Sequence, residues 1–208
     1  MSMKIKLILI IALFCYSCNN PKTETNEFDN SVCLEFVNQS GYPIEICDCV
    51  KAKVSQMKKL TEVKYEDIGL YLNTYLKGAV LLVENFSKSM IQNKFGRFVF
   101  LGSSVLYGAP PQGMAAYVTA KEALWGYTKS LATDMAHYGI TSNMVSPGLT
   151  ITDLTSEISA RVKEVEAMKS PVRRLVTAED TAYHVAHLCA DYSGYLNGIN
   201  LPITSSPV

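Results

Sequence analysis

Glycine is scarce in the first part of this 208-residue chain. Of its 12 glycines, only Gly41, Gly69 and Gly78 precede Gly96. A dinucleotide-binding turn needs closely spaced glycines between a strand and a helix, because backbone amides must approach a pyrophosphate there. Neither Gly-x-x-x-Gly-x-Gly nor Gly-x-Gly-x-x-Gly occurs before Gly96. The sequence therefore excludes a conventional phosphate-binding turn in this part of the chain.

An excess of charge of either sign is also lacking. The 19 Lys and Arg residues balance the 19 Asp and Glu residues, and basic residues form no run beyond single pairs. Binding to nucleic acid or to an anionic membrane surface usually relies on a basic patch. The composition is that of an ordinary globular domain, and we expect no nucleic-acid partner.

Metal-binding spacings are missing as well. Cys47 and Cys49 are separated by one residue, whereas a typical zinc knuckle has two residues between its cysteines. His184 and His187 fall on one predicted helix, but the nearby sequence offers no third ligand. We expect no metal site and interpret these histidines as surface or half-buried residues.

Residues 1–18 have the order of a secretory signal, with two lysines, an apolar run and then small residues. The apolar run is too short to span a bilayer. Ser17-Cys18 and the polar residues after it resemble a bacterial lipoprotein cleavage site, although Cys15 stands where Leu is usual. This segment predicts lipidation of Cys18 and membrane anchoring through it. The alternative is an uncleaved apolar N-terminus.

Residues 19–57 form a polar, cysteine-containing segment or linker. In an exported protein, Cys33, Cys47 and Cys49 could form a disulfide. Cys189 lies in the apolar pattern of a late helix, where we expect it to be part of the core.

The most informative pattern is formed by Ser104, Tyr117 and Lys121. On a helix, Tyr-x-x-x-Lys places both side chains on one face, where the ammonium favours the phenolate. A free phenol ionises at about pH 10. A tyrosine brought toward neutrality can donate a proton to a carbonyl oxygen or accept one from an alcohol. With Ser104 holding that oxygen, the pattern predicts carbonyl–alcohol redox chemistry, whereas Tyr-x-x-x-Lys alone also fits an ordinary amphipathic helix.

The surrounding sequence places this pattern at one end of a parallel sheet. A buried strand runs into Ser104, and open parallel sheets carry their chemistry at such carboxyl ends. A later strand runs into Pro147-Gly148, where a glycine lets the backbone approach a ligand closely. The patterns predict helices at 65–93, 115–137, near 155–169 and near 178–190, and strands at 97–102, 140–146 and near 199–203.

Several further motifs accompany Ser104, Tyr117 and Lys121 from residue 58 to the C-terminus. They are Gly96-Arg97, Asn143-Met-Val-Ser-Pro-Gly-Leu-Thr-Ile-Thr152, Arg174-Leu-Val-Thr-Ala-Glu-Asp180 and Leu196-Asn-Gly-Ile-Asn-Leu-Pro202. Together with Ser–Tyr–Lys, they resemble the short-chain dehydrogenase/reductase family, in particular its acyl-carrier-protein reductase-like members.

The resemblance implies a role for each matching residue. Tyr117 would be the acid/base, Lys121 would also bind the nicotinamide ribose, and Ser104 would orient the substrate. The nicotinamide pocket would be lined by Pro147, Gly148 and Thr152. The implied cofactor is NADP or NAD, and the implied substrate is a small carbonyl compound or alcohol.

The sequence departs from the family at two places besides the glycine-rich turn. Asn-Asn-Ala-Gly, expected near residues 51–54, is absent. The family's fourth catalytic position, usually Asn, aligns with Tyr75, while Asn73 lies two residues away and faces another side of a helix. The identity of that residue stays open between Tyr75 and Asn73.

The fold class that follows is α/β, an incomplete Rossmann-like doubly wound parallel sheet without its N-terminal glycine-rich half. We divide the chain into a leader (1–18), a segment or linker (19–57) and a reductase-like portion (58–208). The strand at 97–102 would then be an exposed sheet edge. The helices at 65–93 and 115–137 are expected to form a homo-oligomer contact.

The function predicted is NAD(P)-dependent carbonyl reduction or alcohol oxidation, with weak cofactor binding because the pyrophosphate turn is missing. The alternative is a non-catalytic envelope lipoprotein, or a truncated or chimeric relic of a reductase. The expected localisation is conflicting, because Cys18 indicates the cell envelope whereas the reductase family is cytoplasmic.

Overall fold

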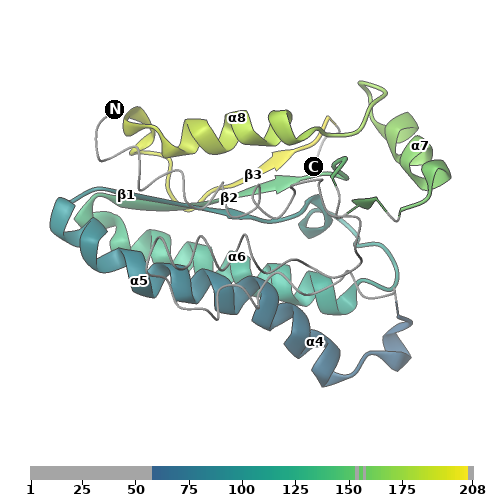
Figure 1. The fold of residues 1–208 in the computed structure, drawn as a ribbon, viewed down its shortest axis with the longest axis horizontal. Helices are drawn as coiled ribbons and strands as arrows, with labels where there is room; N and C mark the ends of the chain where they lie inside the picture. The colour runs from purple at the N-terminus through teal and green to yellow at the C-terminus, as the bar shows by residue number, and fades with distance from the viewer. Residues whose placement is uncertain (1–57, 153–154, 157, 206–208) are drawn as a thin grey trace, which may run out of the picture.

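A computed structural model describes residues 58–152, 155–156 and 158–205. In this part of the chain, three parallel strands carry helices on both faces (Figure 1). The α/β class and the Rossmann-like parallel sheet are therefore confirmed. The predictions made for residues 1–57, including Cys18 lipidation and the disulfide, lie outside the described residues.

The sheet has the order β1-β2-β3, formed by Gly96–Leu101, Ile140–Pro147 and Asn200–Ile203. β1 and β2 are almost entirely buried. Such continuous burial is typical of parallel strands covered on both faces. Within the described residues β2 is the only strand paired with β1, with Gly96 opposite Ile140.

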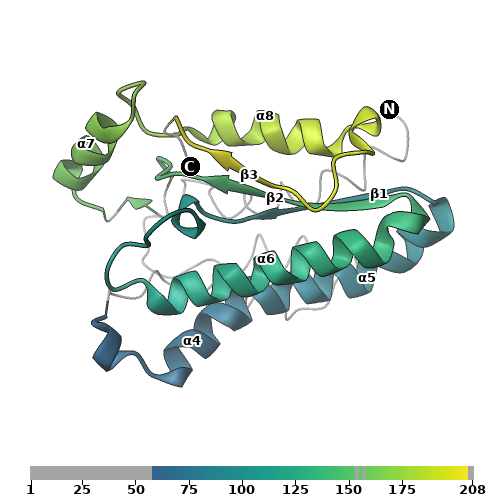
Figure 2. The same cartoon turned by 180° about the vertical axis from the view of Figure 1, so that it is seen from behind.

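Helices α5 (Gly78–Asn93) and α6 (Ala115–Met135) cover one face of the sheet, and α8 (Ala178–Cys189) covers the other (Figure 2). Because side chains alternate along a strand, each strand contributes to two cores. On β1, Phe98 and Phe100 pack toward α5 and α6, whereas Val99 packs toward α8. No helix within the described ranges is long and apolar enough to cross a membrane.

The predicted elements agree with the structure except in two places. The segment 65–93 is helical throughout, but a π-turn at Asn73–Lys77 separates α4 (Tyr65–Leu72) from α5. Helix α7 spans only Ala160–Lys169, so the predicted start near 155 is wrong. The reason is local, because the Ser159 side chain accepts a hydrogen bond from Val162 N and caps the helix at that point.

The family motifs act as cross-links between β2 and the loop before β3. The buried Asn143 side chain donates to Leu196 O at 2.8 Å and accepts from Ile199 N at 3.1 Å. Asn197 accepts from Ser142 N and donates to Ala132 O at the end of α6. These amide side chains satisfy buried backbone groups that the sheet leaves open, which explains why the two motifs occur together.

Arg97 joins the amino end of β1 to the carboxyl end of α8. Its side chain is 4% exposed, and burial lowers the pKa of the guanidinium. It donates to four carbonyl oxygens, those of Gly96, Gly139, Ala190 and Asp191, at 2.8 to 3.4 Å. Two of these follow directly after α8, where a cation also complements the negative end of the helix dipole.

Cys189 lies in the core between β1, β2 and α8, as predicted, and it is a free thiol. Burial raises the pKa of this thiol to about 11, and the positive charge of Arg97 offsets part of the increase. In the unfolded chain the thiol ionises first, so its contribution to stability is complete below about pH 9 and is lost as the pH rises toward 11.

We expect Cys189→Ala to remove this pH dependence. Between about pH 8 and about pH 11, the wild type should lose about 2 kcal/mol more unfolding free energy than the variant. Urea unfolding of both proteins at a series of pH values measures the difference. The cost of the smaller side chain does not depend on pH, so it cancels when the two pH dependences are compared. Parallel curves for the two proteins would contradict the assignment.

Candidate active site

The site lies at the carboxyl end of β1, where a turn carries two serines. Gly102 N donates to Val145 O at 2.8 Å, which continues the ladder one residue past the strand. A Cβ at Gly102 would collide with the side chains of Met144 and Ser146, so only glycine fits. Ser103 and Ser104 follow, and Ser104 begins a short 3-10 helix. The close fit at Gly102 therefore fixes where both hydroxyls leave the sheet.

Lys121 belongs to helix α6, and its side chain is buried against this end of β1. Its side chain is 4% exposed, and Nζ donates to Leu101 O, the last residue of β1, at 2.8 Å. Nζ also lies 3.8 Å from the centre of the Tyr75 ring and 5.7 Å from the centre of the Tyr117 ring. The ammonium is thus held by a carbonyl oxygen and an aromatic face, one turn of α6 away from Tyr117.

Tyr117 lies within a cluster of three tyrosines. Its ring meets Tyr71 and Tyr75 edge-on, with centroid distances of 5.9 and 5.7 Å. Burial raises the pKa of Tyr117, and the hydrogen bond with the Ser103 side chain lowers it by less. The sequence predicted a lowered pKa because of Lys121. That prediction is wrong for this structure, because the ammonium is directed at Leu101 O and the Tyr75 ring while the phenol is largely withdrawn from solvent.

The two serines have different surroundings. Ser103, which the sequence analysis did not single out, is the serine hydrogen-bonded to Tyr117. Its hydroxyl also accepts a long hydrogen bond from Val105 N at 3.4 Å. Ser104 instead lines a cavity shared with Gly148. The adjacent serine pair was the available signal, but spacing alone could not tell which hydroxyl would meet the phenol. The role of Ser104 stays a prediction.

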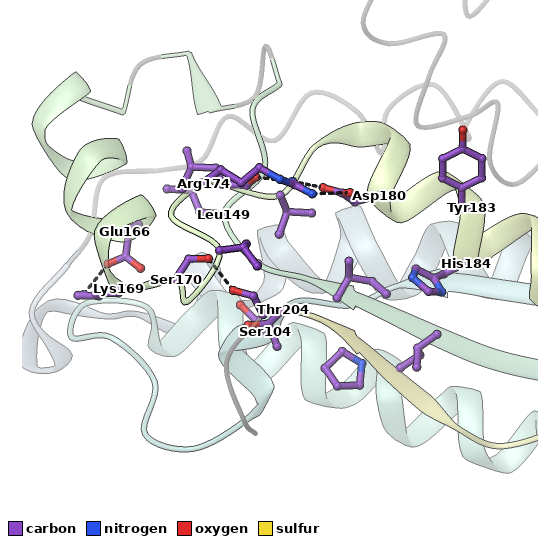
Figure 3. Close-up of a pocket in the computed structure, with 18 residues that line it drawn as sticks. Ser104, Leu149, Glu166, Lys169, Ser170, Arg174, Asp180, Tyr183, His184 and Thr204 are labelled. Carbon is purple, nitrogen blue, oxygen red and sulfur yellow. Dashed lines mark hydrogen bonds and ion pairs between the residues drawn. The ribbon is translucent and has the colours of Figure 1, made fainter.

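A cavity of about 460 Å³ opens beside Ser104 (Figure 3). Glu166 and Lys169 of α7 lie on one side of it, and Tyr183 and His184 of α8 lie on the other. A Cβ at Gly148 would lie 3.4 Å from Val176 Cγ2 and 4.0 Å from Ser104 Oγ. These are ordinary contact distances, so a Cβ would fit at Gly148 and would take up space between Val176 and Ser104. Tyr117 and Lys121 are not among the residues that line it.

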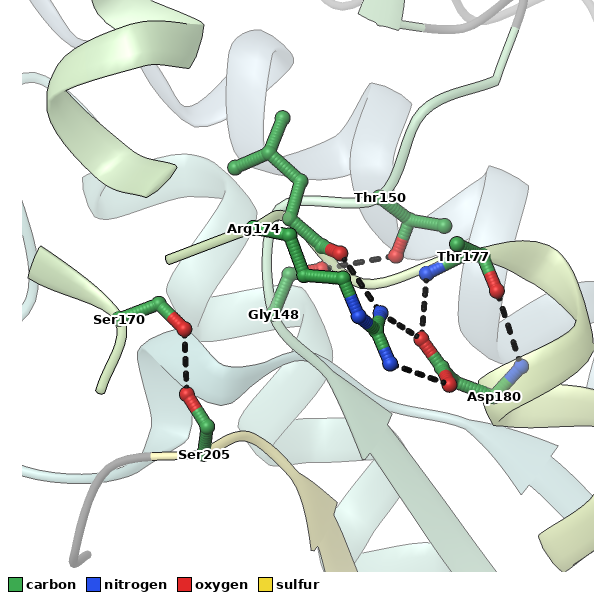
Figure 4. A network of polar contacts seen from close by, with 8 residues as sticks. Gly148, Thr150, Ser170, Arg174, Thr177, Asp180 and Ser205 are labelled. Atoms are coloured by element: carbon green, nitrogen blue, oxygen red, sulfur yellow. Dashed lines mark hydrogen bonds and ion pairs between the residues drawn. The ribbon is translucent and has the colours of Figure 1, made fainter. Parts of the chain in front are cut away.

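The far wall of the cavity is fixed by a polar network (Figure 4). Arg174 pairs with both carboxylate oxygens of Asp180, one of them at 3.0 Å from Nη2, and holds the pKa of that carboxyl well below its usual range. Asp180 also accepts from Thr177 N, and Thr177 Oγ1 accepts from Asp180 N, which forms a capping box. The Arg174–Asp180 motif thus starts α8 and anchors the loop before it.

The residues assigned to the nicotinamide pocket lie along one segment that begins at the last residue of β2. Pro147 ends the strand, and Gly148 N donates to Ile203 O of β3 at 3.1 Å. Thr152 N donates to Thr155 Oγ1 at 3.1 Å, and that hydroxyl donates to Thr150 O at 2.7 Å. The structure brings Pro147 and Gly148 to the sheet end that carries Ser104. The pocket role of all three residues stays a prediction.

Tyr75 and Asn73 differ in position, as their spacing indicated. Asn73 is exposed, whereas Tyr75 is partly buried against α6 and faces Lys121. Of the two residues left open by the sequence, only Tyr75 therefore lies at the site. Within the described residues, no group of three or more His, Cys, Asp or Glu side chains could hold a metal ion.

Comparison with known proteins agrees with this arrangement. A family model described as enoyl-(acyl carrier protein) reductase matches residues 37–205. The chain belongs to the short-chain dehydrogenase/reductase family. The 3-oxoacyl-(acyl-carrier-protein) reductase of Mycobacterium tuberculosis is 31% identical over 92% of this chain and 75% of its own length. The corresponding reductase of Rickettsia conorii is 31% identical over 83% of this chain and 70% of its own length.

Solved structures of the family have the same fold. A structure from Beutenbergia cavernae, described as an NAD(P)-dependent gluconate 5-dehydrogenase with NADP bound at low occupancy, has a TM-score of 0.67 and 27% identity. The match covers 74% of this chain and 62% of the Beutenbergia chain. A gluconate 5-dehydrogenase from Burkholderia cenocepacia has a TM-score of 0.68 at 22% identity, covering 74% of this chain and 61% of its own.

Proposed function

We propose that this short-chain dehydrogenase/reductase catalyses NAD(P)-dependent interconversion of a carbonyl compound and an alcohol. The observation that carries the proposal is the placement of Tyr117, with Ser103 hydrogen-bonded to its phenol and Lys121 one turn along α6, at the carboxyl end of β1. Parallel sheets bind their ligands at this end. Family membership and the NADP-containing Beutenbergia structure support the same cofactor class.

The side chains of this site supply the proton. In the reduction direction, Tyr117 donates its phenolic proton to the carbonyl oxygen as that oxygen gains charge, and becomes a phenolate. The raised pKa of Tyr117 keeps the proton on the phenol at neutral pH, which suits a proton donor. Lys121 lies near the phenolate that remains, and solvent returns the proton. In alcohol oxidation the same atoms act in reverse.

The described residues fit one end of the cofactor. A bound nicotinamide would supply the hydride to the carbonyl carbon or accept it from the alcohol carbon. Gly148 leaves space between Val176 and Ser104 that a larger residue would fill, and Lys121 is buried beside the same sheet end. Because the sequence has no glycine-rich turn before Gly96, we expect the pyrophosphate to contribute little binding energy.

A spectroscopic turnover assay tests the proposed function. The full chain is mixed with NADPH or NADH and a carbonyl substrate, and the loss of reduced-nicotinamide absorbance is followed. A 3-oxoacyl thioester comes first because the mycobacterial and rickettsial relatives are reductases of that class, followed by a keto sugar acid. We expect slow turnover with a high KM for the cofactor. If neither NADPH nor NADH is oxidised with any of the carbonyl compounds, the proposal is contradicted.

The helices 65–93 and 115–137 are proposed to form a homo-oligomer contact. Leu70 on α4 and Val80 on α5 are 47% and 39% exposed. Covering such apolar side chains with a second copy of the chain would stabilise the dimer. Sedimentation of the full chain distinguishes the outcomes, because a monomer at all concentrations would exclude the contact.

Anchoring in the cell envelope through Cys18 is a separate proposal, supported by the signal-like order of residues 1–18. Such an anchor would favour the alternative function, that of a non-catalytic envelope lipoprotein. A labelled fatty acid should be incorporated into the wild type and not into the Cys18→Ser variant. Equal labelling of the two proteins, or no labelling of the wild type, would contradict anchoring through Cys18.

A further inference from the structure

Lys121 needs partners that hold a buried ammonium in place. A charge taken out of water is costly unless polar or charged groups replace its hydration. One partner is Leu101 O, and a second is the face of the Tyr75 ring, 3.8 Å from Nζ to the ring centre. The ring face is the negative side of an aromatic quadrupole, so it attracts a cation.

The position of Tyr75 depends on the π-turn at Asn73–Lys77. In an uninterrupted α-helix each residue has a fixed angular step, and a π-turn changes that step locally. The turn therefore decides which side chain of the long helix faces α6. It leaves Asn73 exposed and directs Tyr75 to Lys121. Such single π-turns occur frequently at functional sites.

Tyr75 also contacts the proton donor. Its ring stacks with Tyr71 at 6.2 Å and meets Tyr117 edge-on at 5.7 Å, with 86° between the ring planes. The same ring thus forms an edge-to-face pair with Tyr117 and presents its face to Lys121. A change in Tyr75 would alter the separation between the phenol and the ammonium.

We propose that Tyr75 is a positioning residue, whose ring fixes the Lys121 ammonium beside Tyr117 through a cation–π contact. The proposal rests on the proposed function, because the position matters for proton transfer at Tyr117. It gives Tyr75 a role that an amide side chain cannot perform, since the contact needs a ring face. The cation–π contact is made by the ring and not by the hydroxyl, so phenylalanine at position 75 should preserve it.

The ring contact is measured first, without any catalysis. An aromatic face shields nuclei above it, so the ε-methylene protons of Lys121 should give a lysine NMR signal shifted upfield, assigned by its loss in Lys121→Met. The signal should persist in Tyr75→Phe and move to the ordinary lysine position in Tyr75→Leu. A wild type without an upfield lysine signal, or a signal unchanged in Tyr75→Leu, would overturn the proposal.

Turnover then tests the consequence. Tyr75→Phe should keep kcat within about twofold of the wild type, and Tyr75→Leu should lower kcat about 10- to 30-fold. Tyr127→Leu is the matched control, because it removes another partly buried ring from the same core without a described contact to the ammonium. Equal kcat values for Tyr75→Leu and Tyr127→Leu would refute the positioning role.

The two readouts separate the possible failures. If the wild type shows no turnover, the proposed function fails, and the NMR signal alone decides whether the ring holds the ammonium. If the wild type is active and Tyr75→Leu matches it, the proposed function stands and the role of Tyr75 is refuted. A melting curve confirms that each variant is folded before either readout is interpreted.

Discussion

Replacing Tyr117 by phenylalanine should lower kcat for carbonyl reduction by about 10²- to 10⁴-fold, the range for loss of a general acid. The variant keeps the ring that meets Tyr71 and Tyr75 edge-on, so the aromatic cluster and the fold should be retained. Only the proton and the hydrogen bond with Ser103 are removed. Steady-state kinetics and a melting curve of the full chain measure the two effects separately.

Tyr127→Phe is the control for this result, because Tyr127 is a second half-buried tyrosine on α6 whose pKa burial also raises. Its kcat should stay within a few-fold of the wild type. The pH profile gives an independent check. Because the pKa of Tyr117 is raised, the alkaline loss of kcat/KM for reduction should occur above about pH 10. Retained turnover in Tyr117→Phe would remove Tyr117 from the mechanism.

Replacing Arg97 by methionine should lower the unfolding free energy by about 2–4 kcal/mol, a large share of the stability of a typical domain. Methionine retains part of the apolar side chain but leaves four carbonyl oxygens without the guanidinium, including those of Ala190 and Asp191 after α8. Ala190 O keeps its hydrogen bond from Ser193 N, so the cost of about 1–3 kcal/mol for an unsatisfied buried acceptor falls on the other carbonyl oxygens. Denaturant unfolding of the full chain measures the loss.

Arg161→Met serves as the matched control, because Arg161 is exposed at the start of α7. Its effect should stay within about 0.5 kcal/mol. Arg97→Lys should fall between the two, because an ammonium cannot reproduce the fork of the guanidinium. If Arg97→Met were as stable as Arg161→Met, the carbonyl cluster would have no energetic role and the link between β1 and α8 would need another explanation.

The sequence predicted the elements well where apolar periodicity was strong. The strands at 96–101 and 140–147 are buried on both faces, and such apolar runs are visible without a structure. The start of α7 was misplaced because its apolar pattern is weak, and the cap at Ser159 decides where the helix begins. The π-turn at Asn73–Lys77 interrupts the α-helix for a single turn, which is too short a stretch for apolar periodicity to reveal.

The candidate site was only partly predictable. Spacing showed that Tyr117 and Lys121 share a helix face, and it separated Asn73 from Tyr75. It could not show that burial would raise the pKa of Tyr117, because burial depends on Tyr71 and Tyr75 from a distant helix. Nor could it show that Ser103 meets the phenol while Ser104 lines the cavity, because that choice depends on the turn after Gly102.

The proposed function requires a site for a nicotinamide cofactor at the carboxyl end of the parallel sheet. The most direct test is a thermal melt of the full chain with and without a large excess of NADPH or NADH, because a ligand that binds the folded state raises the midpoint. We expect an upward shift of the midpoint, and a smaller shift in Lys121→Met. An unchanged midpoint with both cofactors would contradict the proposed function and favour a reductase relic that no longer binds its cofactor.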